Sequence, residues 1–210
     1  VNDAPSGADA TLVVAEDTSR ILTAADFGFT DIDGDALLQV RITTVPASGS
    51  LRLAGAAVSA GDVVTAVQLA AAQLVWTPPA DANGIGLASF TFQVQDNGGT
   101  ANGGADLDLS TNTISFDVTA VNDAPSGADA TLVVAEDTSR ILTAADFGFT
   151  DLDGDALSQV RITTVPGAGS LHLAGAAVSA GDVVTVAQLA AGQLVWTPPA
   201  DANGIGLASF

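Results

Sequence analysis

The sequence predicts an all-β fold in which antiparallel β-sandwiches of about seven strands follow one another in tandem. Three observations predict it: apolar and polar residues alternate in short runs, Gly, Pro, Asn and Asp separate these runs, and the sequence repeats itself after 120 residues. Alternation gives each run one buried and one wetted face, and frequent turn residues favour antiparallel connections. About seven short strands in one copy are typical of a two-sheet sandwich.

The individual strands can be placed in order along the first copy. Residues 12–14 and 20–22 are short apolar runs that end in turn residues. Residues 39–44 show the first clear alternation, and two further short runs follow at residues 51–53 and 74–76. Between these two, the apolar spacing of residues 66–72 favours one or two turns of helix. The last two strands alternate most regularly, at residues 90–95 and 114–119.

The repeat defines the domain organisation. Residues 121–210 match residues 1–90 with eight differences, which indicates a recent tandem duplication. A period of 120 is too long for a solenoid and fits a string of independent domains. We therefore assign residues 1–120 to one complete repeat and residues 121–210 to a second repeat that stops before its last two strands. The second repeat is expected to expose an unpaired sheet edge and to be unstable or self-associating.

The composition excludes several classes of function. The chain has 24 Asp and Glu against 5 Arg, a net charge of 5 − 24 = −19, which argues against nucleic acid as a partner. It contains no Cys, Lys or Tyr, and His172 is its single histidine, so only carboxylates remain for acid–base chemistry and we expect no enzymatic activity. The longest uncharged stretch, residues 63–80, is interrupted by Gln, Thr and two prolines and does not suit a membrane span.

One loop of each copy carries carboxylates on alternate positions around a glycine, DIDGD and DLDGD. Like charges this close together need a compensating cation, and Ca²⁺ takes six to eight oxygen ligands. The loop is no EF-hand, because Gly34 stands at position four and Ile42 at position twelve. The alternative is a solvated turn, in which Asp and Gly are common anyway, but the repetition favours calcium. The candidate ligands are Asp31, Asp33, Asp35, Asp151, Asp153 and Asp155.

Further acidic loops are expected at the end where the chain leaves the first sandwich. Each antiparallel strand reverses direction, and counting strands places Glu16, Asp17 and Asp81 at that end. The linker residues Asn122 and Asp123 follow there, and the DLDGD loop of the second copy is expected to face them. Taken alone, Glu16 and Asp17 are equally explained by a Thr-capped turn.

Three other features of the sequence are interpreted as having a structural role and no role in binding or catalysis. Trp76 and Trp196 precede a double proline on a strand pattern, which favours a place in the core over a sugar-stacking platform. His172 replaces Arg52 on the face of a strand expected to be wetted, so it is assigned to the surface. Residues 102–109 partly match a calcium β-roll, but one partial copy cannot build a roll and is interpreted as a loop.

The ordered set VNDAP, EDT, DxDGD, ITTVPxxGxL, LVWTPPADANG and ASFTFQVQD resembles the cadherin-like repeats of large secreted and surface adhesins of bacteria. The resemblance covers both copies and implies immunoglobulin-like sandwiches strung in tandem, with Ca²⁺ near the linkers. Fewer ions per junction than in cadherins are expected, because the linker offers fewer ligands and the DANG loop has no Glu. The ligands that the resemblance implies are Glu16, Asp17, Asp81, Asn122, Asp123, Asp151 and Asp153.

These observations together predict a calcium-binding, non-enzymatic extender repeat of a large extracellular adhesin, in which Ca²⁺ stiffens the junction between repeats for cell adhesion. Its expected partners are the neighbouring repeats of the same chain and, further, cell-surface or matrix ligands, and its expected location is the cell surface or the secreted fraction. The alternative is a module that binds a glycan or a protein partner directly. Near-identical repetition favours the extender, since a terminal ligand site usually differs from its neighbours.

Overall fold

The computed structural model describes all 210 residues and divides them into two compact units, Val1–Val121 (unit 1) and Asn122–Phe210 (unit 2). Regular structure consists of fifteen strands, two α-helices of five residues each and three short 3₁₀ helices. The predicted all-β fold is therefore confirmed.

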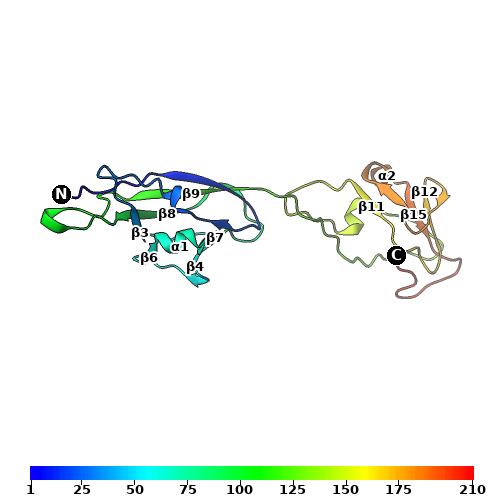
Figure 1. The fold of residues 1–210 in the computed structure, drawn as a ribbon. Coiled ribbons are helices and arrows are strands. Elements are labelled where there is room, and N and C mark those ends of the chain that lie inside the picture. Colours follow the sequence, from blue (N-terminus) through cyan, green and yellow to red (C-terminus); the bar gives the residue numbers. More distant parts are fainter. The chain divides into compact units, whose positions relative to one another are not determined.

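Unit 1 contains two sheets. One has five strands in the order β1-β9-β8-β3-β6, and the other has four in the order β2-β7-β4-β5. Figure 1 shows β8 and β9 of the first sheet side by side. Nine strands exceed the seven or so predicted, because β5 and β6 are too short to show alternation. The strands are β1 (Ala10–Ala15), β2 (Arg20–Ile21), β3 (Leu37–Ile42), β4 (Ser50–Leu53), β5 (Ala56–Ala57), β6 (Val63–Thr65), β7 (Leu74–Thr77), β8 (Gly84–Asp96) and β9 (Asn112–Thr119).

The helices of unit 1 are single turns between strands: η1 (Ala24–Phe27), α1 (Ala66–Ala70) and η2 (Ala101–Gly103). The predicted helical segment is thus present as α1. Thr65 begins it with a capping box, in which its hydroxyl accepts from Gln68 N at 3.2 Å and Gln68 Oε1 accepts from Thr65 N at 2.9 Å. The two bonds satisfy donors that the start of a helix otherwise leaves unpaired.

One strand pair departs from the predicted antiparallel pattern. β1 runs parallel to β9, with Ala10 opposite Ile114 and Ala15 opposite Thr119, whereas all other pairs in unit 1 are antiparallel. The chain enters this sheet beside the start of β9 and leaves it beside the end of β1. The first and last strands therefore run in the same direction, and they can pair only in parallel.

The core of unit 1 lies between the two sheets and is rich in aromatic rings. Trp76 is fully buried and stacks on Phe116 with ring centroids 3.9 Å apart, while Phe27 meets the edge of Phe92 at 4.8 Å. The predicted core position of Trp76 is thus confirmed. The other large side chains that are fully buried in unit 1 are Phe90, Leu22, Ile42, Leu69, Leu74 and Ile114.

Unit 2 keeps the four-stranded sheet, in the order β10-β15-β12-β13, but only two strands of the other, β11 and β14. Residues 130–135, identical in sequence to β1, form no strand, and the residues after Thr197 form none either. The sequence of β9, the strand that β1 pairs with, occurs once in the chain. The strands are β10 (Arg140–Ile141), β11 (Gln159–Arg161), β12 (Ser170–Leu173), β13 (Ala176–Ala177), β14 (Val183–Thr185) and β15 (Leu194–Thr197), with the helices η3 (Ala144–Phe147) and α2 (Val186–Ala190).

Candidate metal centre

The DIDGD loop of unit 1 folds its three carboxylates onto one point. Carboxylate oxygens of Asp31, Asp33 and Asp35 all lie within 4.8 Å of one another. Asp31 Oδ1 accepts from Asp35 N at 2.9 Å, and Asp33 Oδ2 accepts from Asp3 N at 2.7 Å. Gly34, with φ of 82°, provides the left-handed backbone of the tight turn. The loop therefore concentrates negative charge beside the N-terminal segment.

Two residues absent from the predicted ligand set complete this cluster. Asp96 ends β8 and is fully buried, and its Oδ1 accepts from Asn2 Nδ2 at 3.1 Å and from Gly98 N at 2.8 Å. Asn2 also donates from Nδ2 to Ala105 O at 2.7 Å. A signal for Asp96 exists in the sequence, because the alternation of Phe90, Phe92 and Val94 puts a carboxylate on the core face of the strand.

Three buried oxygens of this cluster have no hydrogen-bond partner: Asn2 Oδ1, Asp31 Oδ2 and Asp96 Oδ2. An unpaired buried polar atom costs on the order of 1–3 kcal/mol, and a charged one costs more, so three together require compensation. A Cβ atom built on Gly98 would collide with Asn2 Oδ1 and Asp35 Oδ2, so these two oxygens border the same small space. We call Asn2, Asp31, Asp33, Asp35 and Asp96 the entry cluster.

Electrostatics point to the same need for a cation. Burial, followed by the charges of Asp31, Asp96 and Asp33, raises the pKa of Asp35 above its ordinary value. The structure contains two salt bridges, Arg20 to Asp26 at 3.0 Å and Arg140 to Asp146 at 2.9 Å, and neither includes a residue of the cluster. An all-oxygen donor set with several carboxylates and no cationic side chain fits a hard divalent ion such as Ca²⁺.

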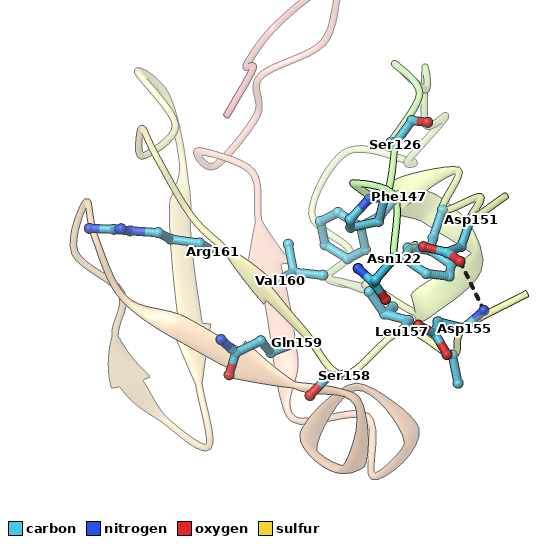
Figure 2. A pocket seen from close by; sticks show the side chains of 14 residues that line it. Asn122, Ser126, Phe147, Asp151, Asp155, Leu157, Ser158, Gln159, Val160 and Arg161 are labelled. Atoms are coloured by element: carbon cyan, nitrogen blue, oxygen red, sulfur yellow. Dashed lines mark hydrogen bonds between the residues drawn. The ribbon is translucent and has the colours of Figure 1, made fainter. Parts of the chain in front are cut away.

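Unit 2 repeats part of this arrangement. Asp151 Oδ1 accepts from Asp155 N at 2.9 Å (Figure 2), and Asp153 Oδ2 accepts from Asp123 N at 2.6 Å, as at the equivalent positions of unit 1. The predicted linker ligand Asp123 is thus attached through its backbone to the DLDGD loop. Asn122 occupies the position of Asn2. The later part of β8, residues 91–96, which supplies Asp96 in unit 1, occurs once in the chain.

The other end of unit 1 brings together the remaining predicted ligands, Glu16, Asp17 and Asp81, in a different way. Glu16 is 1% exposed, and its two oxygens accept from Val121 N at 2.5 Å and from Asn83 Nδ2 at 3.1 Å. Asp17 Oδ1 accepts from Asp81 N at 3.2 Å. We call Glu16, Asp17, Asp81, Asn83 and Val121 the exit clasp. The carboxylates of Glu16 and Asp17 have donors within the clasp, and these bonds tie the two loops to each other and to Val121, which follows β9.

The exit clasp explains why acidic residues occupy these turns. Asp17 and Asp81 have φ of 58° and 54°, a left-handed conformation that Asp tolerates better than most residues. Unit 2 repeats two of the contacts, Asn203 Nδ2 to Glu136 Oε2 at 3.2 Å and Asp201 N to Asp137 Oδ1 at 3.0 Å. Glu136, in contrast to Glu16, is exposed.

The two tryptophans, the histidine and the helices that the sequence analysis considered form no binding site. Trp76 is fully buried and donates to Ser48 O at 3.4 Å, so its ring is no surface platform for sugars. Trp196 is half-buried and makes the equivalent bond to Ala168 O at 3.3 Å. His172 lies half-buried on β12, where unit 1 has the exposed Arg52. None of the helices has the length and hydrophobicity that a membrane span requires.

Comparison with known proteins identifies the family. The family model described as bacterial Ig domain matches residues 2–108, and the chain belongs to this family. The predicted resemblance to bacterial repeats of the immunoglobulin-like type is confirmed. Domains of this family are structural and adhesion modules typical of surface proteins. Neither a search of curated proteins nor a search of solved structures returned a match.

Proposed function

We propose that the chain is a calcium-binding, non-enzymatic extender repeat of a large extracellular adhesin, in which Ca²⁺ stiffens the linker between successive repeats. The observation that carries the proposal is the entry cluster. Three buried oxygens without partners, on Asn2, Asp31 and Asp96, lie with two further carboxylates and no cationic side chain. Membership of the bacterial Ig domain family supports the extender part of the proposal.

The entry cluster offers enough oxygens for calcium. Asp31, Asp33, Asp35 and Asp96 contribute carboxylates and Asn2 an amide oxygen, which is the ligand chemistry that Ca²⁺ prefers. The ion would offset the burial and the repulsion by Asp31, Asp96 and Asp33 that together raise the pKa of Asp35. Extracellular calcium modules bind in the range of about 10⁻⁴ to 10⁻³ M, and an affinity of this order suits a structural role.

Each unit binds the linker residues on its own side of the boundary through a carboxylate, and this is why bound calcium would stiffen the linker. In unit 1 the last residue, Val121, donates its N–H to Glu16 of the exit clasp. In unit 2 the backbone of Asp123 donates to Asp153 of the DLDGD loop. An ion bound by Asp151, Asp153 and Asp155 would fix Asp153 and, through it, Asp123. Linker residues on both sides of the boundary would then be held by ordered carboxylates.

The direct test is a calorimetric titration of Ca²⁺ into the metal-free 210-residue chain and its Asp96→Asn variant. Asn keeps the acceptor that Asn2 and Gly98 use and removes the charge of the unpaired oxygen. We expect saturable binding in the native chain, weakened at least tenfold in unit 1 by Asp96→Asn. Asp129→Asn is the matched control, because it removes an exposed carboxylate with the same change of charge.

Two results would contradict the proposal. Heat no larger than that of dilution in the native chain would leave the acidic loops as solvated turns. Equal weakening by Asp96→Asn and Asp129→Asn would show that calcium responds only to net charge. Binding should also raise the melting temperature of unit 1, since a ligand that binds only the folded state stabilises it by mass action.

A further inference from the structure

Four asparagines of the chain directly precede a glycine: Asn83, Asn97, Asn102 and Asn203. In such a pair the backbone nitrogen of the glycine can attack the side-chain carbonyl carbon of the asparagine, because the glycine has no Cβ to block the approach. The new N–Cγ bond closes a succinimide ring, and the amide nitrogen leaves as ammonia with the proton of the glycine N–H. Water then opens the ring to aspartate or isoaspartate.

The fold decides which of the four pairs can react. The asparagine side chain must turn back onto the nitrogen of the next residue, and this requires rotation about the bonds of the asparagine itself. Hydrogen bonds to the side chain or to the glycine N–H resist the rotation, so a bonded pair reacts only after local opening of the structure.

Asn97 is held at each group that the reaction needs. Its backbone N donates to Ala36 O at 3.1 Å, and its Oδ1 accepts from Ala36 N at 2.9 Å. The attacking nitrogen, Gly98 N, donates to the buried carboxylate of Asp96 at 2.8 Å. The fold therefore protects Asn97, although its side chain lies at the surface.

Asn83 and Asn203 occupy equivalent turns and are held through the amide nitrogen that would leave. Asn83 Nδ2 donates to Glu16 Oε2 at 3.1 Å, and Asn203 Nδ2 donates to Glu136 Oε2 at 3.2 Å. Gly84 also begins β8, where it lies opposite Val118. Reaction at Asn83 would thus require the exit clasp to open.

Asn102 differs from the other three. Asn102 and Gly103 are both exposed, and neither the Asn102 side chain nor the Gly103 N–H takes part in a hydrogen bond of the structure. Their φ angles are 58° and 85°, a left-handed conformation that Asn and Gly adopt more readily than other residues. No hydrogen bond has to break before the side chain can turn onto Gly103 N.

The residues that follow Asn102 hold the N-terminal segment of unit 1. Ala105 N donates to Asn2 O at 2.9 Å, and Asn2 Nδ2 donates to Ala105 O at 2.7 Å. Gly104 lies so close that an added Cβ would stand 3.0 Å from Asn2 Cβ. Isoaspartate continues the chain through its side-chain carbon, which lengthens the backbone by a methylene group and shifts the residues after it.

We propose that Asn102 is a site of spontaneous deamidation, and that the isoaspartate formed there weakens the hydrogen bonds between Ala105 and Asn2. The reaction needs water and neither an enzyme nor a metal ion. It takes place at Asn102 in the folded chain, whereas Asn97 reacts only when unit 1 opens. The proposal goes beyond the proposed function and does not depend on calcium.

The test follows the folded 210-residue chain in mildly alkaline buffer with EDTA, since loss of the glycine N–H proton favours the attack. Cleavage before aspartate releases residues 96–105 as one peptide, so mass spectrometry with electron-transfer dissociation compares Asn97 and Asn102 in the same sample. Shorter peptides that begin at a newly formed aspartate are counted as well. We expect deamidation to be at least tenfold faster at Asn102 than at Asn97.

The same chain in urea is the matched control for the fold. Both asparagines are followed by two glycines, so their rates should converge once the bonds of Asn97 are lost. Equal rates at Asn97 and Asn102 in the folded chain, or a difference that persists in urea, would overturn the assignment of the site to the fold.

Amide exchange of Ala105 tests the effect on Asn2. It should become faster in the aged native chain and stay unchanged in an equally aged Asn102→Gly variant, which lacks the reacting amide and suits the positive φ. Exchange that does not respond to isoaspartate would overturn this part of the proposal. Absence of calcium binding in the titration above would contradict the proposed function alone, because no step of the deamidation uses an ion.

Discussion

The carboxylate of Asp108 accepts a hydrogen bond from the backbone N–H of Gly7 at 2.8 Å, although 101 residues separate the two in sequence. Asp108 is 4% exposed and accepts three more bonds, from Ser110 N and Oγ at 2.9 Å and from Asn112 Nδ2 at 2.7 Å. The side chain thus joins the segment before β1 to the segment before β9, the two strands that pair in parallel.

The pH dependence of unit 1 follows from this group. Burial opposes ionisation of Asp108, but the bonds from Ser110, Gly7 and Asn112 outweigh it and lower its pKa below the ordinary value. The unfolded chain therefore binds the proton more readily than the folded one. The stabilisation is present above about pH 4, near the unfolded pKa, and is lost as the pH falls through the lowered folded pKa. Asp108→Asn should cost about 1–3 kcal/mol at pH 7 and flatten this acid dependence, measured by urea unfolding.

Asp108→Asn is informative because Asn replaces one of the two acceptor oxygens with an NH₂ group, which is a donor. Its amide nitrogen would face the donors of Gly7 or Ser110, and no rotation satisfies both. An unchanged slope of stability against pH in the variant would show that other carboxylates govern acid unfolding.

Gly98→Ala tests the space within the entry cluster. An added Cβ would collide with Asn2 Oδ1 and Asp35 Oδ2, so we expect calcium affinity to fall at least tenfold in a calorimetric titration. Gly167→Ala is the control, since a Cβ there meets nothing within 4 Å and the equivalent residue of unit 1 is already Ala47. Equal affinities of the two variants would place the ion elsewhere.

Glu16→Gln tests the exit clasp. Both carboxylate oxygens accept hydrogen bonds, and Gln has a single acceptor oxygen and no charge to strengthen these bonds, so the change should cost about 1–3 kcal/mol. Glu136→Gln at the exposed equivalent of unit 2 should change stability by less than about 0.5 kcal/mol. Thermal unfolding of both variants in EDTA measures the difference, and a matching loss at Glu136 would contradict a special role of burial at Glu16.

Trp76→Ala should destabilise unit 1 by about 3–5 kcal/mol, because it removes a fully buried ring that stacks on Phe116. Trp196→Ala, at the half-buried equivalent, should cost distinctly less. Urea unfolding followed by circular dichroism compares the two. Similar losses would indicate that the ring of Trp196 is as well packed as that of Trp76.

Alternation and turn residues were sufficient to predict most strands, because each strand of a sandwich has one dry and one wet face. They were insufficient for β8, which extends from Gly84 to Asp96 instead of residues 90–95, because its register shifts between Gly84 and Ala88 interrupt the period. The parallel pairing of β1 with β9 depends on the direction of strands far apart in sequence, which local periodicity does not contain.

Some residues of the candidate site could also be predicted from local sequence, whereas others depend on the tertiary fold. Asp31, Asp33 and Asp35 lie in one loop, and their spacing alone predicts that their carboxylates lie close together. Asp96 and Asn2 reach the cluster from segments 94 residues apart, so only the tertiary fold reveals them. Glu16, Asp17 and Asp81 were predicted from the count of strands, but their hydrogen bonds to Val121, Asn83 and each other depend on details of turn geometry.

The parallel pairing of β1 and β9 has a mechanical consequence. A force that pulls on the chain before Ala10 and after Thr119 draws the two strands past each other along their length, and the six residue pairs of the ladder are loaded together in shear. Antiparallel terminal strands that enter and leave at one end would instead open like a zipper, one hydrogen bond at a time. The resistance of unit 1 to stretching is therefore set by a whole row of bonds, and rupture requires all of them to yield at once.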